Sequence, residues 1–100
     1  MKELEFEWDD NKALKNKKKH EGITFEEAKT VFEDERAILF DDPDHSIDEQ
    51  RFIIIGMSYK SRMLVVCHCY REEGNTIRII SARRATKSET RQYIELNESW

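Results

Sequence analysis

The chain has 100 residues, a length that suits one domain built around one hydrophobic core, and we expect residues 1–100 to form that single domain. Apolar residues make up 38% of the chain and fall in periodic runs, while the 38% of charged residues are mixed in sign, and both features favour a folded chain over a disordered one. No apolar run approaches the roughly 18 residues of a membrane span. The first residues lack the apolar segment of a signal peptide, so we expect a cytoplasmic protein.

Charge is distributed unevenly along the chain. Residues 1–50 carry 8 Lys/Arg against 16 Asp/Glu, and residues 51–100 carry 9 against 5. Most of the basic charge lies in two blocks, Lys12–His20 and Arg78–Arg91. Two such blocks can form one anion-binding surface if the fold brings them together. The alternative, that each is a solvated helix face, stays open from charge alone.

The first half of the chain predicts one strand and two helices. Residues 4–8 alternate apolar and acidic side chains, which indicates a half-buried strand near a sheet edge. Asp9 or Asp10 can cap a helix over residues 11–20, which Gly22 ends. Thr24 and Glu27 form a capping box for a second helix. Its core face carries apolar residues at helical spacing: Phe25, Ala28, Val31 and Phe32.

The second half predicts a meander of strands followed by a helix. Candidate strands cover residues 37–40, 51–57, 62–70 and 76–81, with turn signals at residues 41–46 and 72–75. Thr86 and Glu89 form a second capping box, which starts a final helix that runs to about Asn97 and has few apolar residues to hold it. The expected fold is α+β: a mostly antiparallel, twisted sheet with the first two helices on one face and a C-terminal helix.

The arginine-rich stretch from Arg78 to Arg91 is the main candidate for chemistry. Strand alternation separates Arg78 and Ile80 from Ile79 and Ser81. Arg83 and Arg84 come at the end of the strand, just before a helix N-terminus. Free helix N–H groups and guanidinium groups both bind anions in a fixed geometry, so this junction suits a phosphate group. A solvated turn is the alternative for the two arginines.

Two further side chains of this stretch lie four residues apart on one helix face, Glu89 and Tyr93. A carboxylate and a phenol beside arginines can support phosphodiester transfer without a metal. The capping box, however, explains Glu89 fully, and packing against the sheet is an equal explanation for Tyr93.

The first basic block places Lys12, Asn16 and Lys19 on one helical stripe, with His20 in line four residues after Asn16. A histidine there can act as an acid or a base near neutral pH. Its alternative role is that of a C-cap residue that interacts with the helix dipole.

Metal and cofactor sites are not expected. Cys67-His68-Cys69 lacks the second pair of ligands that a zinc site needs, and strand alternation turns His68 away from the thiols. There is no glycine-rich phosphate loop and no serine nucleophile elbow. His45 follows a proline turn and is a turn residue rather than a ligand.

Five segments, in order, resemble the sequence blocks of the BrnT family, the toxins of type II toxin–antitoxin systems. They are Phe6-Glu7-Trp8-Asp9-x-x-Lys12-x-x-x-Asn16-x-x-Lys19-His20, Phe25-Glu26-Glu27-Ala28, Phe40-Asp41-Asp42-Pro43-Asp44-His45-Ser46, Glu49-x-Arg51-Phe52 leading to Ile55-Gly56-x-Ser58, and Arg78-Ile79-Ile80-Ser81-Ala82-Arg83-Arg84-Ala85. The resemblance covers about residues 6–93, and five segments in register are a specific signal. One departure is that Glu21 stands between His20 and Gly22, where the family commonly reads Lys-His-Gly.

The resemblance implies a RelE-like fold and a ribonuclease that shuts down translation. It implies that the partners are an RNA substrate and a BrnA-like ribbon–helix–helix antitoxin, with DNA contacted only through that antitoxin. Carried over by position, the candidate catalytic residues are Arg62, Arg83, Arg84, Glu89, Tyr93 and His20. Basic residues for RNA binding are Lys12, Lys19, Arg78, Lys87 and Arg91. The mechanism expected is metal-independent: arginines bind the scissile phosphate while the RNA 2′-hydroxyl attacks it. The rival hypothesis is a non-catalytic binding module that holds nucleic acid or an acidic protein.

Overall fold

The computed structural model describes residues 4–42, 49–71 and 75–98 of the chain. The elements are β1 (Glu5–Glu7), α1 (Asp10–Lys19), α2 (Phe25–Thr30), the 3₁₀ turn η1 (Val31–Glu33), β2 (Ile38–Asp41), β3 (Phe52–Met57), β4 (Met63–Arg71), β5 (Thr76–Arg84) and α3 (Lys87–Glu98). The predicted order of strands and helices and the α+β class are confirmed. The predicted turn around His45 and most of the predicted loop after β4 lie outside the described residues.

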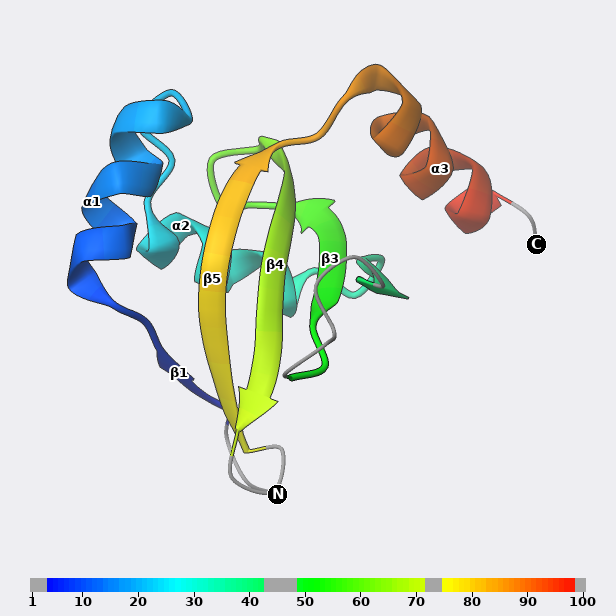
Figure 1. Cartoon of the computed structure of the whole chain (residues 1–100). Helices are drawn as coiled ribbons and strands as arrows, with labels where there is room; N and C mark the ends of the chain where they lie inside the picture. The colour runs from blue at the N-terminus through cyan, green and yellow to red at the C-terminus, as the bar shows by residue number, and fades with distance from the viewer. Residues whose placement is uncertain (1–3, 43–48, 72–74, 99–100) are drawn as a thin grey trace.

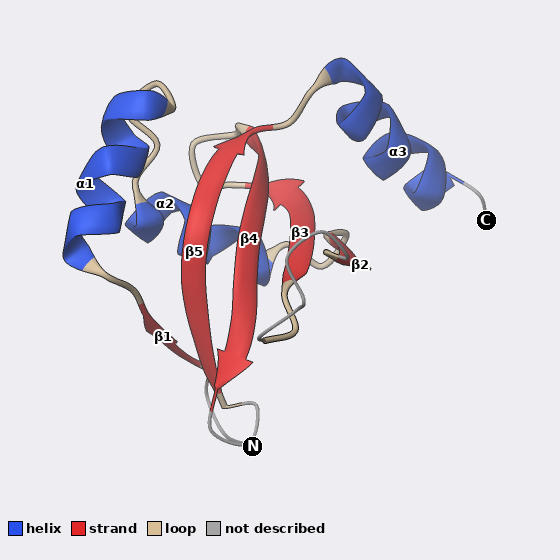
Figure 2. Cartoon of the chain, in the orientation of Figure 1, coloured by secondary structure: helices blue, strands red, loops and turns tan. Residues whose placement is uncertain are grey.

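The strands form one sheet in the order β1-β5-β4-β3-β2. Strands β2 to β5 pair antiparallel in sequence, and β1 adds to the edge beside β5 in the parallel sense. The edge position predicted for the first strand is therefore confirmed. Figures 1 and 2 show α1 and α2 together beside one face of the sheet, with α3 apart from them near β3. Within the described part of the chain, no helix has the length and apolar character needed to cross a membrane.

The hydrophobic core lies between the sheet and the first two helices. Its buried members come from the second helix with its flanking turns and from the central strands: Ile23, Phe25, Ala28, Val31, Ile54, Leu64, Val66, Ile77, Ile79 and Ala82. Phe6 and Trp8 reach this core from the β1 segment. Burial of one such large side chain contributes about 1.5–3 kcal/mol, so this face of the sheet carries most of the hydrophobic stabilisation. The predicted core face of the second helix is confirmed.

Local capping fixes both ends of α1. The Asp9 carboxylate accepts hydrogen bonds from the backbone N–H groups of Asn11 (2.8 Å) and Lys12 (3.1 Å). At the other end, the Gly22 N–H donates to the Lys17 carbonyl (2.9 Å), the closing bond of a Schellman motif. Glu21 precedes that glycine with φ +54°, in the left-handed region that favours glycine. Glu21, the residue inserted relative to the family pattern, is thus accommodated in the turn that ends α1, and its positive φ strains the backbone.

A β-bulge in β5 changes which side chains share a face of the sheet. Cys67 pairs with Ser81, but His68 pairs with Ile79, so Ile80 has no opposite residue on β4. The prediction that alternation separates Ile80 from Ser81 is wrong, because both line the same hollow on the face away from α1 and α2. The strand also continues to Arg84, three residues beyond its predicted end. Without the bulge, Arg83 would point to the core side.

Candidate functional site

The sheet divides the predicted arginine cluster into two parts. Arg83 pairs with Val65, and both line the hollow on the open face of the sheet, which α1 and α2 do not cover. Arg84 pairs with the core residue Leu64, and cross-strand partners share a face, so Arg84 points to the side of α1 and α2. Arg62 also lies on that side, where it contacts α2. The arginines therefore do not converge on one point from one face.

On the open face, Glu89 holds Arg83 in a two-point ion pair. The Nη1 and Nη2 atoms of Arg83 donate to the two carboxylate oxygens of Glu89, each at 2.8 Å. The same carboxylate accepts the Thr86 backbone N–H (2.8 Å), and the Glu89 N–H donates to the Thr86 hydroxyl (3.1 Å). The predicted capping box is confirmed. Glu89 thus fixes the start of α3 and the direction of the Arg83 side chain together.

The ion pair also defines what Glu89 can do chemically. Hydrogen bonds from Arg83 lower the pKa of Glu89 to about 2, with a further contribution from Thr86 and against an opposing effect of burial. A carboxylate with so low a pKa stays ionised near neutral pH and is a weak base. The arrangement therefore suits a positioning residue better than a residue that moves protons.

Arg83 keeps part of its hydrogen-bonding capacity for a ligand. A guanidinium has five N–H donors. Two of them bind Glu89, and a third, on Nη1, binds the Arg84 carbonyl at 3.2 Å. The Nε–H and the second N–H of Nη2 have no partner within the described residues, and these two lie side by side on one edge of the group. That edge has the geometry that binds two phosphate oxygens at once.

On the side of α1 and α2, Arg62 forms a second two-point ion pair, with Glu27. Its Nε donates to Glu27 Oε2 at 2.9 Å, and its Nη2 donates to Glu27 Oε1. The Ser58 hydroxyl donates to the same Oε2 at 2.7 Å. The Glu27 side chain is 1% exposed and the Arg62 side chain 20%. A buried carboxylate needs such partners, because an unpaired one would be strongly destabilising.

The charge of Glu27 follows from these contacts. Burial by itself raises the pKa of this carboxyl group, but hydrogen bonds from Arg62 and Ser58 and the positive charges of Arg62 and Lys60 outweigh it, so its pKa lies below the usual value. The capping box predicted for α2 is only half present. Thr24 accepts the Glu27 N–H at 3.0 Å, while the Glu27 side chain turns to Arg62 instead of returning to Thr24.

The first basic block lies against the end of β5 through a buried asparagine. Asn16 donates to the Ala82 carbonyl (2.9 Å) and accepts the Ala82 N–H (3.0 Å), and it also donates to the Ile23 carbonyl (3.2 Å). Asn16 is therefore structural, although it shares a helical stripe with the exposed Lys12 and Lys19. Its bonds place the two basic blocks side by side, as an anion-binding surface requires.

The predicted acid–base candidate His20 caps the C-terminus of α1. Its backbone N–H donates to the Asn16 carbonyl at 2.8 Å, as the structural alternative for this residue proposes. The pKa of Arg62 is raised mainly by Glu27 and to a smaller extent by the negative charge of Glu21. Glu21 follows His20 directly, so the turn that carries both residues lies near Arg62. This turn, Arg62 and Arg84 form the part of the candidate site on the side of α1 and α2.

Tyr93 anchors the last helix. Its hydroxyl donates to Asp34 Oδ2 at 2.8 Å, and burial together with this bond raises the pKa of Tyr93 to about 12. Asn97 adds a bond to the Arg36 carbonyl at 3.1 Å. Residues Lys87–Glu98 contain no buried side chain, so these polar contacts hold α3, in agreement with the prediction of a loosely held helix. Tyr93 is partly buried and α3 contacts β3, so the hydrogen bond adds to the contact of this helix with the sheet.

Comparison with known proteins places the chain in a family. Residues 8–89 match the family described as the ribonuclease toxin BrnT of type II toxin–antitoxin systems. The chain belongs to the BrnT family. Its fold is similar to the crystal structure of the Brucella abortus ribonuclease toxin BrnT, with a TM-score of 0.65 and 22% sequence identity over 84% of this chain and 99% of that one. A comparison with curated protein sequences finds no match.

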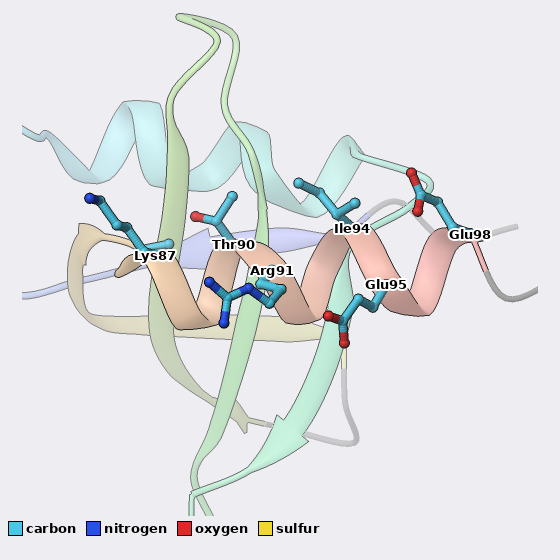
Figure 3. A pocket seen from close by; sticks show the side chains of 7 residues that line it. Lys87, Thr90, Arg91, Ile94, Glu95 and Glu98 are labelled. Atoms are coloured by element: carbon cyan, nitrogen blue, oxygen red, sulfur yellow. The ribbon is translucent and has the colours of Figure 1, made fainter.

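In this BrnT-family chain the remaining basic candidates are Lys87 and Arg91 on α3 and Arg78 on β5. Lys87 and Arg91 line a hollow of about 620 Å³ along α3, and Figure 3 shows them toward the start of the helix, with Glu95 and Glu98 toward its end. The basic part of α3 is thus the part next to Arg83. Arg78 is partly neutralised, because its Nη1 donates to Glu7 Oε2 at 2.9 Å across the β1–β5 pair.

Three residues that hold the candidate site together are not predicted as such from the sequence: Glu27, Ser58 and Asp34. The spacing predicts Glu27 only as a cap, and Glu27 and Ser58 otherwise occur only within segments that resemble the family. Asp34 Oδ2 accepts both the Tyr93 hydroxyl and the Met57 N–H (2.8 Å), so it joins α3 to β3. The sequence contains one signal for Ser58, which is the glycine two residues before it. A Cβ atom at Gly56 would lie only 2.9 Å from the Val31 side chain, so only glycine fits there without a shift. That close approach indicates tight packing of this turn against the helices.

The thiols and the described carboxylates supply no metal site. Within residues 4–42, 49–71 and 75–98, no group of three or more His, Cys, Asp and Glu side chains is placed to hold a metal ion. Cys67 lies 3.6 Å from Asp42 Oδ2, and burial with this negative charge raises the pKa of the thiol to about 11. Cys67 therefore stays protonated and is a poor nucleophile at neutral pH.

Proposed function

We propose that this chain is a metal-independent endoribonuclease in which Arg83 binds the scissile phosphate of RNA. The BrnT family supplies the general activity, that of a ribonuclease toxin. The observation that supports this site is the Arg83 side chain, which Glu89 holds by one edge and leaves with a second donor edge unpartnered in the described chain. A guanidinium fixed in advance loses little entropy when it binds a phosphate.

In the proposed reaction the RNA 2′-oxygen attacks the adjacent phosphorus. The 2′-hydroxyl loses its proton to a base as its oxygen bonds to phosphorus, the bond to the 5′-oxygen breaks, and the 5′-oxygen gains a proton, so the other product carries a 2′,3′-cyclic phosphate. Arg83 stabilises the negative charge that develops on the phosphate oxygens, with the start of α3 beside it, while Arg84 contacts the RNA from the side of α1 and α2. Glu89 is a positioning residue, and Tyr93 is an anchor for α3. His20 lies with Arg62 and Arg84 on the side of α1 and α2, so the group that exchanges protons with RNA bound at Arg83 is not assigned.

The RNA backbone on either side of the reacting phosphate is proposed to bind five basic residues: Lys12, Lys19, Arg78, Lys87 and Arg91. Each such contact replaces a counterion, so binding weakens as salt concentration rises.

In the cell we propose that the chain acts in the cytoplasm, inhibits translation, and is neutralised by a BrnA-like ribbon–helix–helix antitoxin. Contact with DNA is made by that antitoxin alone.

The direct test is cleavage of RNA by the purified chain in the presence of EDTA. Wild type should cut RNA and leave cyclic phosphate ends, while Arg83→Ala should lose about 100-fold or more in kcat/KM. Arg71→Ala, which removes one positive charge from the far end of β4, is the matched control and should stay within about threefold. Loss of wild-type cleavage in EDTA, or full activity of Arg83→Ala, contradicts the proposal.

Glu89→Gln tests the positioning role. Glutamine still completes a capping box, so α3 should persist, but the ion pair that aims Arg83 is lost. We expect kcat to fall by about 10-fold with little change in the helix signal of circular dichroism. If the chain binds RNA but neither it nor any variant cuts it, the non-catalytic binding module becomes the correct reading. Growth arrest on expression, relieved by Arg83→Ala, separates the two in cells.

A further inference from the structure

A hollow of about 310 Å³ lies on the open face of the sheet, next to Arg83. Its floor is apolar and comes from the three central strands: Ile53, Val65, Cys67 and Ile80. Its rim is polar and consists of Asp42, Arg51, Ser81 and Arg83. Small-molecule sites commonly combine an apolar floor with a few polar groups in this way, and this volume is at the small end of their range.

The β-bulge builds this hollow. It places Ser81 and Arg83 on the same face as Cys67, and Cys67 pairs with Ser81 on one side and with Ile53 on the other. Arg51 lies two residues before Ile53, and side chains two apart along a strand point the same way. Arg51, just before β3, and Arg83, on β5, therefore reach the hollow from opposite sides of β4.

Arg51 has capacity for a ligand. Its Nε atom is buried and makes no hydrogen bond within the described chain, although it forms an ion pair with Glu49 Oε1 at 3.4 Å. The Arg51 side chain is 27% exposed. A buried guanidinium nitrogen without a hydrogen bond is unfavourable, and an anion that enters the hollow would satisfy it. The backbone carbonyl of Arg51 accepts the Asp42 N–H at 2.9 Å, but the reaction derived above does not use the Arg51 side chain.

We propose that this hollow is a binding site for one nucleotide of the RNA substrate, with Arg51 as a second phosphate-binding cation opposite Arg83. The inference rests on the proposed function, since it places the RNA at Arg83. The apolar floor accepts the flat face of a base, and a guanidinium can also stack on a base. The protonated Cys67 thiol adds no charge that would repel the phosphate. The carboxylate of Asp42 repels it, so the phosphate lies toward the arginines.

The test is binding of a short single-stranded RNA with 2′-O-methyl groups, which cannot be cut through its 2′-oxygens. Arg51→Ala should weaken its Kd by about 10-fold or more, while Arg71→Ala, with the same loss of charge on the same face, should weaken it less than about threefold at equal salt. Equal weakening by both variants would mean general electrostatic attraction and would overturn the site. Urea unfolding of both variants confirms that the fold is intact.

Ser81→Leu provides a second test that leaves every charge in place. The larger side chain fills the hollow, so Kd should again rise by about 10-fold. An unchanged Kd for this variant overturns the proposal even if Arg51→Ala fails to fold. Cleavage of unmodified RNA is measured in parallel: wild-type binding without cleavage contradicts the proposed function alone, whereas cleavage with no effect of Arg51→Ala or Ser81→Leu contradicts the nucleotide site alone.

Discussion

Replacing Arg62 with alanine should destabilise the whole fold, because it leaves the buried carboxylate of Glu27 without its ion-pair partner. Glu27 is 1% exposed and keeps only the Ser58 hydroxyl as a side-chain partner when the arginine is gone. Removal of one partner from a buried ion pair costs about 3–5 kcal/mol. A domain of this size has a free energy of unfolding of about 5–15 kcal/mol, so the variant should fold but lie close to its stability limit.

The matched control is Arg78→Ala, which breaks the exposed pair with Glu7. Those side chains are 30% and 41% exposed, and a pair of that kind contributes about 0–1 kcal/mol. Urea unfolding, followed by circular dichroism, measures both variants. The double variant Arg62→Met/Glu27→Gln should regain part of the loss, since no buried charge remains.

The loss in Arg62→Ala should also depend on pH. In wild type the pKa of Glu27 is lowered, so the ion pair stabilises the fold above the ordinary glutamate pKa and this contribution is lost as the solution becomes more acidic. In Arg62→Ala burial is no longer opposed by the arginine, so the same pKa is raised and the fold loses stability as pH rises. The difference between the two proteins should thus be larger at about pH 8 than at about pH 5. A loss for Arg62→Ala below about 1 kcal/mol at both values, equal to that of Arg78→Ala, refutes this reasoning.

Three other variants test single features. Glu21→Gly should raise the free energy of unfolding by about 1 kcal/mol, because glycine relieves the positive φ at the end of α1; a loss would mean that this strain is absent. Tyr93→Phe should leave kcat within about threefold of wild type but speed hydrogen exchange in α3, and a fall of about 100-fold in kcat would restore a catalytic role for the phenol. His68 is fully buried among aromatic rings, and burial lowers its pKa despite a bond to the Val66 carbonyl. The free energy of unfolding of the wild type should therefore decrease from about pH 7 to about pH 5, and it should decrease less in His68→Leu, which has no imidazole to protonate.

The sequence by itself determined the order of the elements and the local caps. Asp9, Thr24 and the Thr86–Glu89 pair bond within four residues along the chain, so their spacing alone predicts them. Helical periodicity likewise found the buried face of α2, and strand patterns found the strands of the sheet. The same patterns found the two arginines at the end of β5, and the resemblance to BrnT gave the activity that the family match then supported.

The tertiary structure decided which side chains share a site. Arg62 bonds Glu27 across 35 residues and Tyr93 bonds Asp34 across 59, and no local spacing encodes such partners. The bulge at Ile80 reversed the alternation, which sent Arg83 to the open face and Arg84 to the other. Side chains alternate with a period of two, so a single extra residue exchanges the faces of every residue after it. Sequence predicted the arginines, but only the register of β4 against β5 shows that they serve two surfaces.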